Sequence, residues 1–128
     1  MKKKILIVDD EADMRLYLES LIAEQGYETA TASDGDNGYD LAKSFKPDVI
    51  TLDVIMERET GIKFYRNLLK DPALKGTPVV IISGVGRYNE LFGRDHATMP
   101  KPFAFIEKPP DVAQLLSKIE SAANHLVS

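Results

Sequence analysis

Acidic residues stand directly after two apolar runs of the sequence. Asp9 and Asp10 follow residues 5–8 (Ile-Leu-Ile-Val), and Asp53 follows residues 49–52 (Val-Ile-Thr-Leu). Carboxylates that lie close together repel one another unless a cation neutralises them. Ligand sets made only of oxygen select a hard cation, so these residues favour Mg²⁺, with Mn²⁺ able to substitute for it.

Two further polar residues follow later apolar runs. Ser83 ends a third run, and Lys108 comes just after a fourth. A hydroxyl and an ammonium beside a metal ion make a space that suits the oxygens of a phosphoryl group. One carboxylate can then act as a nucleophile and form an aspartyl phosphate, and Asp53 is the best candidate because it stands alone between the other groups. The backbone carbonyl of Ile55 can complete the metal ligands.

These residues can meet only if the apolar runs are neighbouring strands. The runs are too short for helices and most are rich in β-branched residues. An unbroken apolar run is typical of a strand covered on both faces, as in a parallel sheet. One stretch differs, because it alternates with Glu and Thr as a half-exposed edge strand does. The predicted strands are 5–8, 27–32 (the edge), 49–52, 79–82 and 103–106.

Helical stripes of apolar residues separate the predicted strands. They run over 14–22, 41–45, 62–69 and 112–126. Gly26 is placed to end the first helix, and Asp111 is placed to cap the last. Residues 84–102 carry few apolar side chains and several Gly and Pro residues, so only a short helix near 88–92 is expected there.

Strands that alternate with helices predict an α/β fold. We expect a doubly wound, flavodoxin-like sheet of five parallel strands in the order 2-1-3-4-5, with helices on both faces. In such a sheet ligands bind beyond the carboxyl ends of the strands, at the point where the strand order reverses. That point lies between the first and third strands, so Asp9, Asp10 and Asp53 are expected to meet there, flanked by Ser83 and Lys108.

Length and composition restrict the function classes. A chain of 128 residues predicts a single domain over 1–128. A net charge of −4 and a pI near 5.2 argue against nucleic-acid binding. The apolar runs are too short to cross a membrane, and no export signal precedes them. The chain has no cysteine, which excludes disulfides, Cys-ligated metals and a thiol nucleophile and favours the cytoplasm.

Several motifs together resemble the receiver domain of two-component response regulators, of the chemotaxis-regulator type. The resemblance covers nearly the whole chain. It implies that Asp53 accepts a phosphoryl group from a histidine kinase or a phosphotransfer protein. It also implies that Asp10 binds Mg²⁺ directly and that Asp9 acts mainly through water. The matching segments are residues 5–11, 47–53, 61, 78–83 and 105–109.

The same resemblance implies a switch that responds to the phosphoryl group. Ser83 and Lys108 would contact the group, and Phe105 would be the aromatic switch residue. The downstream protein target would bind residues 84–102 and the last helix. We expect a stand-alone receiver that is a monomer or dimerises on phosphorylation, and that catalyses only its own phosphorylation and dephosphorylation.

The sequence departs from the family pattern after Asp53 and in the unusually long spacing between Ser83 and the lysine that follows the fifth strand. Glu57 stands four residues after Asp53, where the family usually has Pro, and adds charge near the expected metal site; a solvated loop is the simpler interpretation. Lys101 also precedes a Pro and competes with Lys108 for the phosphate-binding role. We choose Lys108 because residues 103–106 supply a strand before it.

Two other functions remain as alternatives. The first is a receiver-like protein-interaction module that does not need phosphorylation, which Glu57 and the unusual segment 84–102 favour. The second is a metal-dependent phosphohydrolase built on the acidic residues. Phosphatases with an Asp nucleophile typically place a second Asp two residues later, and here that position is Ile55.

Overall fold

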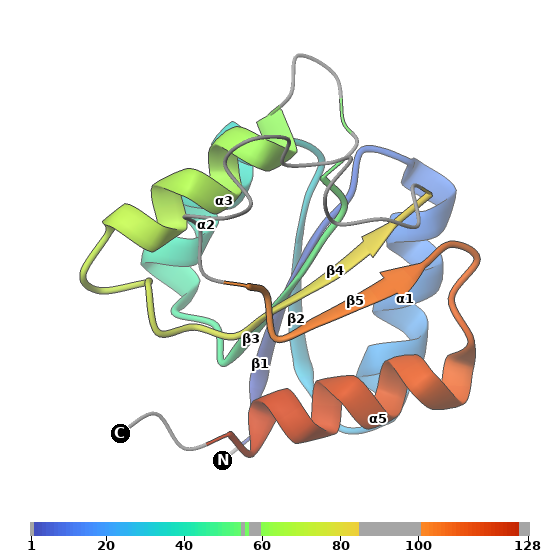
Figure 1. The fold of residues 1–128 in the computed structure, drawn as a ribbon. Helices are drawn as coiled ribbons and strands as arrows, with labels where there is room; N and C mark the ends of the chain where they lie inside the picture. The colour runs from blue at the N-terminus through green and yellow to red at the C-terminus, as the bar shows by residue number, and fades with distance from the viewer. Residues whose placement is uncertain (1, 55, 57–59, 85–100, 126–128) are drawn as a thin grey trace.

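The computed structural model describes residues 2–54, 56, 60–84 and 101–125. Its centre is a parallel sheet with the strand order β2-β1-β3-β4-β5, which confirms the predicted fold class and order (Figure 1). The strands are β1 (Lys4–Val8), β2 (Glu28–Ala32), β3 (Val49–Leu52), β4 (Val79–Ser83) and β5 (Ala104–Glu107).

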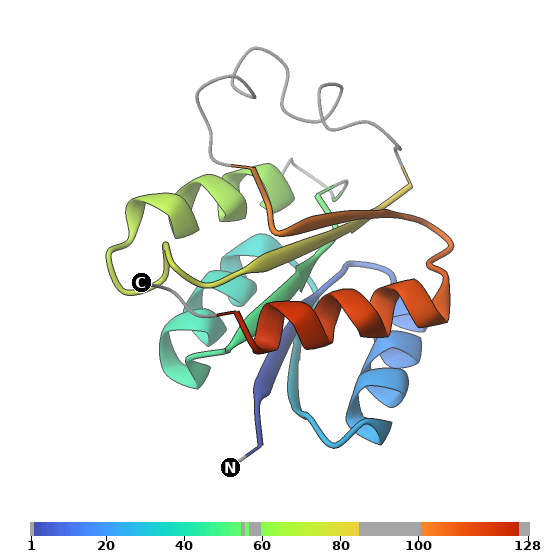
Figure 2. The same cartoon turned by 60° about the horizontal axis from the view of Figure 1, so that its bottom comes forward.

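Helices cover both faces of the sheet. On one face lie α1 (Ala12–Glu24) and α5 (Val112–Ala123), and on the other lie α2 (Gly35–Phe45) and α3 (Thr60–Lys70). Figure 2 shows α5 passing across the strands beside α1. None of the helices in the described residues combines the length and the apolar character needed to cross a membrane.

Alternate residues of the inner strands fill the two cores. In β1, Leu6 and Val8 face α2 and α3, whereas Ile5 and Ile7 face α1 and α5. All four side chains are buried. Burial on both faces explains why the inner strands are continuous apolar runs.

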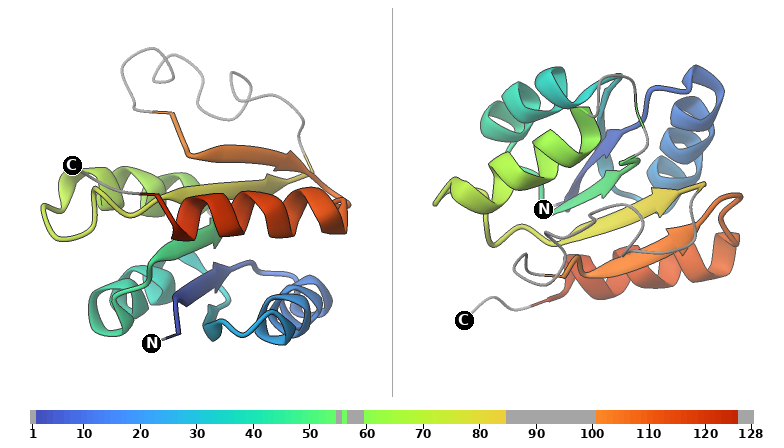
Figure 3. Two further views of the ribbon diagram at one scale, coloured as in Figure 1. Left: turned by 90° about the horizontal axis from the view of Figure 1, so that it is seen from below. Right: turned by 45° about the horizontal axis from the view of Figure 1, so that its top comes forward.

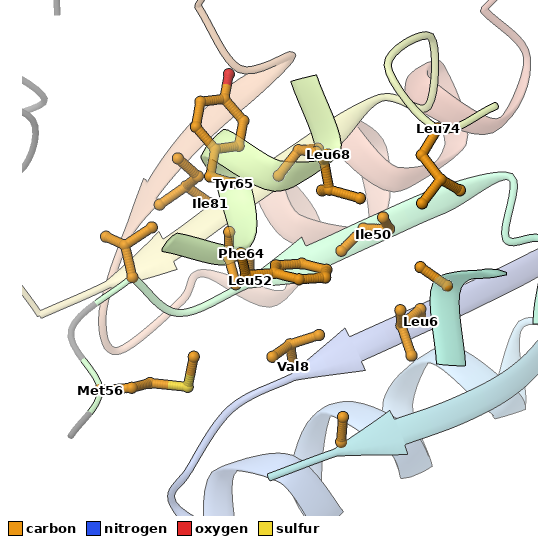
Figure 4. Packing of buried hydrophobic residues seen from close by; sticks show 14 residues of the cluster. Leu6, Val8, Ile50, Leu52, Met56, Phe64, Tyr65, Leu68, Leu74 and Ile81 are labelled. Atoms are coloured by element: carbon orange, nitrogen blue, oxygen red, sulfur yellow. The ribbon is translucent and has the colours of Figure 1, made fainter. Parts of the chain in front are cut away.

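The core beneath α2 and α3 is closed by large side chains of α3. Phe64 and Leu68 are 1% and 2% exposed and lie over the side chains of β3 (Figure 4). The edge strand β2 is only half-buried, as its alternating sequence predicts. The packing therefore holds β1, β3 and β4 at the centre of the sheet. It also fixes the positions of their carboxyl ends, which lie at one edge of the sheet.

Short-range signals set most element ends as expected. Gly26 takes the left-handed conformation after α1, with φ of 94°. The Asp111 side chain accepts a hydrogen bond of 2.9 Å from the Gln114 N–H and caps α5. β5 begins one residue later than predicted, although the Phe103 N–H still donates to the Val79 carbonyl at 2.8 Å. The short helix expected near 88–92 lies outside the described residues.

Candidate functional site

Backbone hydrogen bonds extend the sheet past the ends of its strands. The Asp9 N–H donates to the Ala32 carbonyl at 3.1 Å, and the Asp53 N–H donates to the Val8 carbonyl at 2.9 Å. All the strands run in the same direction, so their carboxyl ends share one edge of the sheet (Figure 3). The sheet itself thereby places the first residues after β1 and β3 side by side.

Three carboxylates gather at this edge. Asp9 and Asp53 are 1% and 4% exposed, whereas Asp10 is open to solvent. One oxygen from each of the three lies within 4.8 Å of the others. The structure therefore brings together the three acids that the sequence places after its first and third strands.

One carboxylate oxygen of this cluster lacks a hydrogen bond. Asp9 Oδ1 accepts from the Glu11 N–H at 2.9 Å, but the buried Asp9 Oδ2 has no hydrogen-bond partner among the described residues. The Lys108 Nζ lies 3.0 Å from this oxygen, close enough for charge attraction but not aligned as a hydrogen bond. A buried oxygen with an unused lone pair, in a set of oxygen donors only, fits a hard divalent cation such as Mg²⁺.

Lys108 neutralises the cluster. Among the described residues its Nζ pairs with three carboxylates, those of Asp9 at 3.0 Å, Glu11 at 2.8 Å and Asp53 at 3.0 Å. Burial acts to lower the pKa of Lys108, but the contacts with these carboxylates outweigh burial and raise it above its usual value. The ammonium is therefore permanently charged at neutral pH.

The backbone of Lys108 is tied to the neighbouring strand. Its N–H donates to the Ser83 carbonyl at 2.8 Å, which carries the β4–β5 pairing past the end of β5. Lys101, the competing candidate, is exposed and lines a groove with Tyr65 and Phe103. Lys108 is thus the lysine that the fold brings to the acidic cluster.

The two predicted switch residues lie on β4 and β5. Ser83 is the last residue of β4 and is fully buried. Phe105 pairs with Ile81 in the sheet, is half-buried, and packs against the core beneath α3. It also lines an open pocket of about 490 Å³ with Glu107 and Lys108. Both residues therefore stand on the strands that lead to the site.

Two predicted features lie outside the described residues, namely the Ile55 carbonyl and Glu57.

The backbone directly after β3 is closely packed against the start of α3. A Cβ added to Gly61 would lie 2.6 Å from the Val54 Cα and 2.7 Å from the Asp53 carbonyl oxygen. Only glycine allows α3 to approach the chain after β3 so closely, and this contact fixes the backbone of Asp53.

Two side chains near the site were not recognised from the sequence. Glu11 precedes α1 and reaches Lys108, 97 residues away. Arg15 donates from its guanidinium to the Asp9 carbonyl at 2.8 Å. The sequence motif 5–11 includes Glu11, but nothing in its local spacing predicts which side chain Glu11 contacts.

Residues 5–120 match the family described as Response regulator receiver domain. The chain belongs to this family. It is 33% identical over 125 residues to the chemotaxis protein CheY of Thermotoga maritima, covering 93% of this chain and 98% of that protein. The match therefore covers most of both proteins.

Other relatives of this receiver domain are longer. The response regulator PleD of Caulobacter vibrioides is 36% identical over 123 residues, which are 94% of this chain but 26% of PleD. The chain thus spans about a quarter of that relative. Among solved structures, CheY4 of Vibrio cholerae superposes with a TM-score of 0.82 at 26% identity, covering 95% of this chain and 99% of CheY4. The receiver domain is a signalling module of two-component systems, and the acidic cluster lies where its fold is open to a ligand.

Proposed function

We propose that this receiver domain is a phosphorylation-activated switch of a two-component phosphorelay and that Asp53 is its phosphoacceptor. The single observation that carries the proposal is the buried Asp53 carboxylate, held 3.0 Å from the Lys108 ammonium beside two further acids. A nucleophile in this setting lies beside a cation and within a set of oxygens that could hold a metal ion.

The phosphoryl donor is the phosphohistidine of a histidine kinase or a phosphotransfer protein. A carboxylate oxygen of Asp53 attacks the phosphorus, the P–N bond of the donor breaks, and the imidazole leaves with the electron pair and takes up a proton. Asp9, Asp10 and the carboxylate of Asp53 would hold Mg²⁺ together with the Ile55 carbonyl, Asp9 mainly through water. Bound Mg²⁺ would neutralise the acids and the incoming phosphoryl oxygens.

Lys108 is placed to serve both states of Asp53. Its ammonium already pairs with the free carboxylate and would pair with an oxygen of the phosphoryl group after transfer. The Ser83 hydroxyl would donate to another phosphoryl oxygen. The new group adds roughly −2 charge and three acceptor oxygens, so Ser83 and Lys108 would move toward it.

The readout would follow from the strands that carry these two residues. The backbone bond between Lys108 and Ser83 couples the ends of β4 and β5, so the two strand ends would shift together. Phe105 would change its rotamer, and the surface of α5 with residues 84–102 would then bind a downstream protein. Of that segment, residues 85–100 lie outside the described structure. We propose a cytoplasmic protein that is a monomer or dimerises on phosphorylation.

The proposal is tested by phosphorylation with acetyl phosphate and Mg²⁺, followed by intact mass measurement. The wild-type protein should gain one phosphoryl group, and Asp53→Asn should gain none. Asp40→Asn is the matched control, because it removes an exposed acid of α2 and should leave phosphorylation unchanged. An adduct at the wild-type level in Asp53→Asn would refute the assignment.

The same protein samples distinguish the proposed switch from the two alternative functions. A phosphorylation-independent module would give no adduct and no spectral change with beryllofluoride and Mg²⁺. A phosphohydrolase would turn over a generic phosphoester many times per molecule, whereas a switch would only dephosphorylate itself.

A further inference from the structure

Glu11 is an unusual partner of Lys108. Its Oε1 makes the shortest of the three carboxylate contacts of the ammonium, at 2.8 Å. Its side chain is 62% exposed, whereas those of Asp9 and Asp53 are 1% and 4% exposed. Glu11 therefore binds Lys108 at the solvent-exposed edge of the site, which we call the rim. Asp9 and Asp53 bind it at the buried base of the site, which we call the floor.

The backbone of Glu11 is held by hydrogen bonds, whereas its side chain is mostly exposed. Its N–H donates to Asp9 Oδ1 at 2.9 Å, and its carbonyl accepts from the Arg15 N–H at 2.9 Å. The side chain can therefore follow the ammonium toward solvent without any change in α1.

Lys108 and a divalent cation need the same carboxylates. The ammonium lies 3.0 Å from an oxygen of Asp9 and from an oxygen of Asp53, and both residues belong to the cluster that fits Mg²⁺. A cation held by these acids repels the ammonium, so Lys108 has to lengthen its contacts with the floor of the site. A side chain that is only 11% exposed cannot lose all its carboxylates without a large cost.

We propose that Glu11 is the positioning residue that holds Lys108 at the rim while the acidic cluster is occupied. This inference rests on the proposed function, since it concerns the same cation site. Glu11 lowers the cost of moving the ammonium and therefore favours cation binding.

The experiment measures Mg²⁺ binding to the metal-free protein by isothermal titration calorimetry. Glu11→Gln keeps the shape of the side chain and removes its charge, and it should weaken Mg²⁺ binding about two- to fivefold, as expected for an exposed ion pair. Asp13→Asn removes an exposed acid two residues away in the first turn of α1 and should change the Kd by less than about 1.5-fold.

A double-mutant cycle with Lys108→Met separates the role proposed for Glu11 from its direct attraction for the cation. If Glu11 acts through Lys108, then Glu11→Gln should affect the Kd in the Lys108→Met background no more than Asp13→Asn does. Lys108→Gln replaces Lys108→Met if the latter does not fold, as judged by its thermal transition.

The outcomes are distinct. An equal effect of Glu11→Gln in both backgrounds means that Glu11 attracts the cation directly, and this overturns the inference. Unchanged or tighter Mg²⁺ binding in Glu11→Gln overturns it as well, while the proposed function stands. A wild-type protein that binds no Mg²⁺ at millimolar concentration overturns the proposed function and the inference together.

Discussion

Removing the Lys108 ammonium should destabilise the metal-free protein strongly. In Lys108→Met, Asp9 and Asp53 keep their buried carboxylates and lose the cation that lies 3.0 Å from each. Oxygens of the two residues lie within 4.8 Å of one another. With an effective dielectric constant near 20, two like charges at that distance repel by about 3.5 kcal/mol. Breaking a buried ion pair by removing one partner costs about 3–5 kcal/mol, which agrees with that figure.

Mg²⁺ should reverse most of this loss. A divalent ion supplies the missing positive charge, and in the variant it no longer competes with the ammonium for Asp9 and Asp53. Ligand binding to the folded state alone stabilises the protein in proportion to the logarithm of the ligand concentration over Kd. The increase in unfolding free energy on adding Mg²⁺ should therefore be larger for Lys108→Met than for the wild type.

The assay is urea unfolding followed by circular dichroism, in EDTA and in millimolar MgCl₂. Lys101→Met is the matched control, because it removes an exposed lysine away from the acidic cluster and should change stability by less than about 0.5 kcal/mol. The reasoning is refuted if Lys108→Met and the wild type have the same unfolding free energy in EDTA, or if both gain equally from Mg²⁺.

Three further predictions concern a glycine beside the site, a buried hydroxyl in the sheet and a hydrogen bond between α2 and the end of α3. Gly61→Ala places a Cβ 2.6 Å from the Val54 Cα, just after Asp53, and should cost about 1–3 kcal/mol and slow phosphorylation by acetyl phosphate, whereas Gly84→Ala, whose Cβ would meet no atom of the described residues within 4 Å, should be nearly neutral in urea unfolding. Thr51→Val removes a buried hydroxyl that has no partner among the described residues and should raise the free energy of unfolding by about 1 kcal/mol, measured as a higher urea midpoint; a lower midpoint would contradict this. The hydrogen bond from Tyr39, 2.8 Å long, lowers the pKa of Asp71, so it stabilises the fold above about pH 4 and is lost as the pH falls. Tyr39→Phe should raise that pKa in an NMR titration, and an unchanged value would show that the bond does not form in solution.

The architecture followed from local patterns in the chain. The runs 5–8, 49–52 and 79–82 are inner strands because their residues are apolar on both faces, with Thr51 as the one exception, and 28–32 is an edge strand because its residues alternate. Parallel strands bring their carboxyl ends to one edge. The meeting of Asp9, Asp10 and Asp53 could therefore be predicted without coordinates.

Other features of the site depend on distances that no local pattern contains. The sequence placed Lys108 near the cluster, but its pairing with Glu11 joins side chains 97 residues apart. The unbonded Asp9 Oδ2 and the close approach of Gly61 to Asp53 are likewise properties of packed atoms. The roles proposed for Ile55 and for residues 85–100 stay predictions, because those residues lie outside the described structure.

There is a physical reason why the sequence predicts the fold and the position of the acids but not the side-chain contacts of the site. The periodicity of apolar residues reports which face of each element is buried, and burial of those faces is enough to select the fold and the edge where ligands bind. The partner that a charged side chain chooses depends on its length, its rotamer and its exposure in the folded chain. The meeting of the acids at 9, 10 and 53 could thus be predicted from the sequence. The contacts of Lys108 with three carboxylates could be known only from the folded structure.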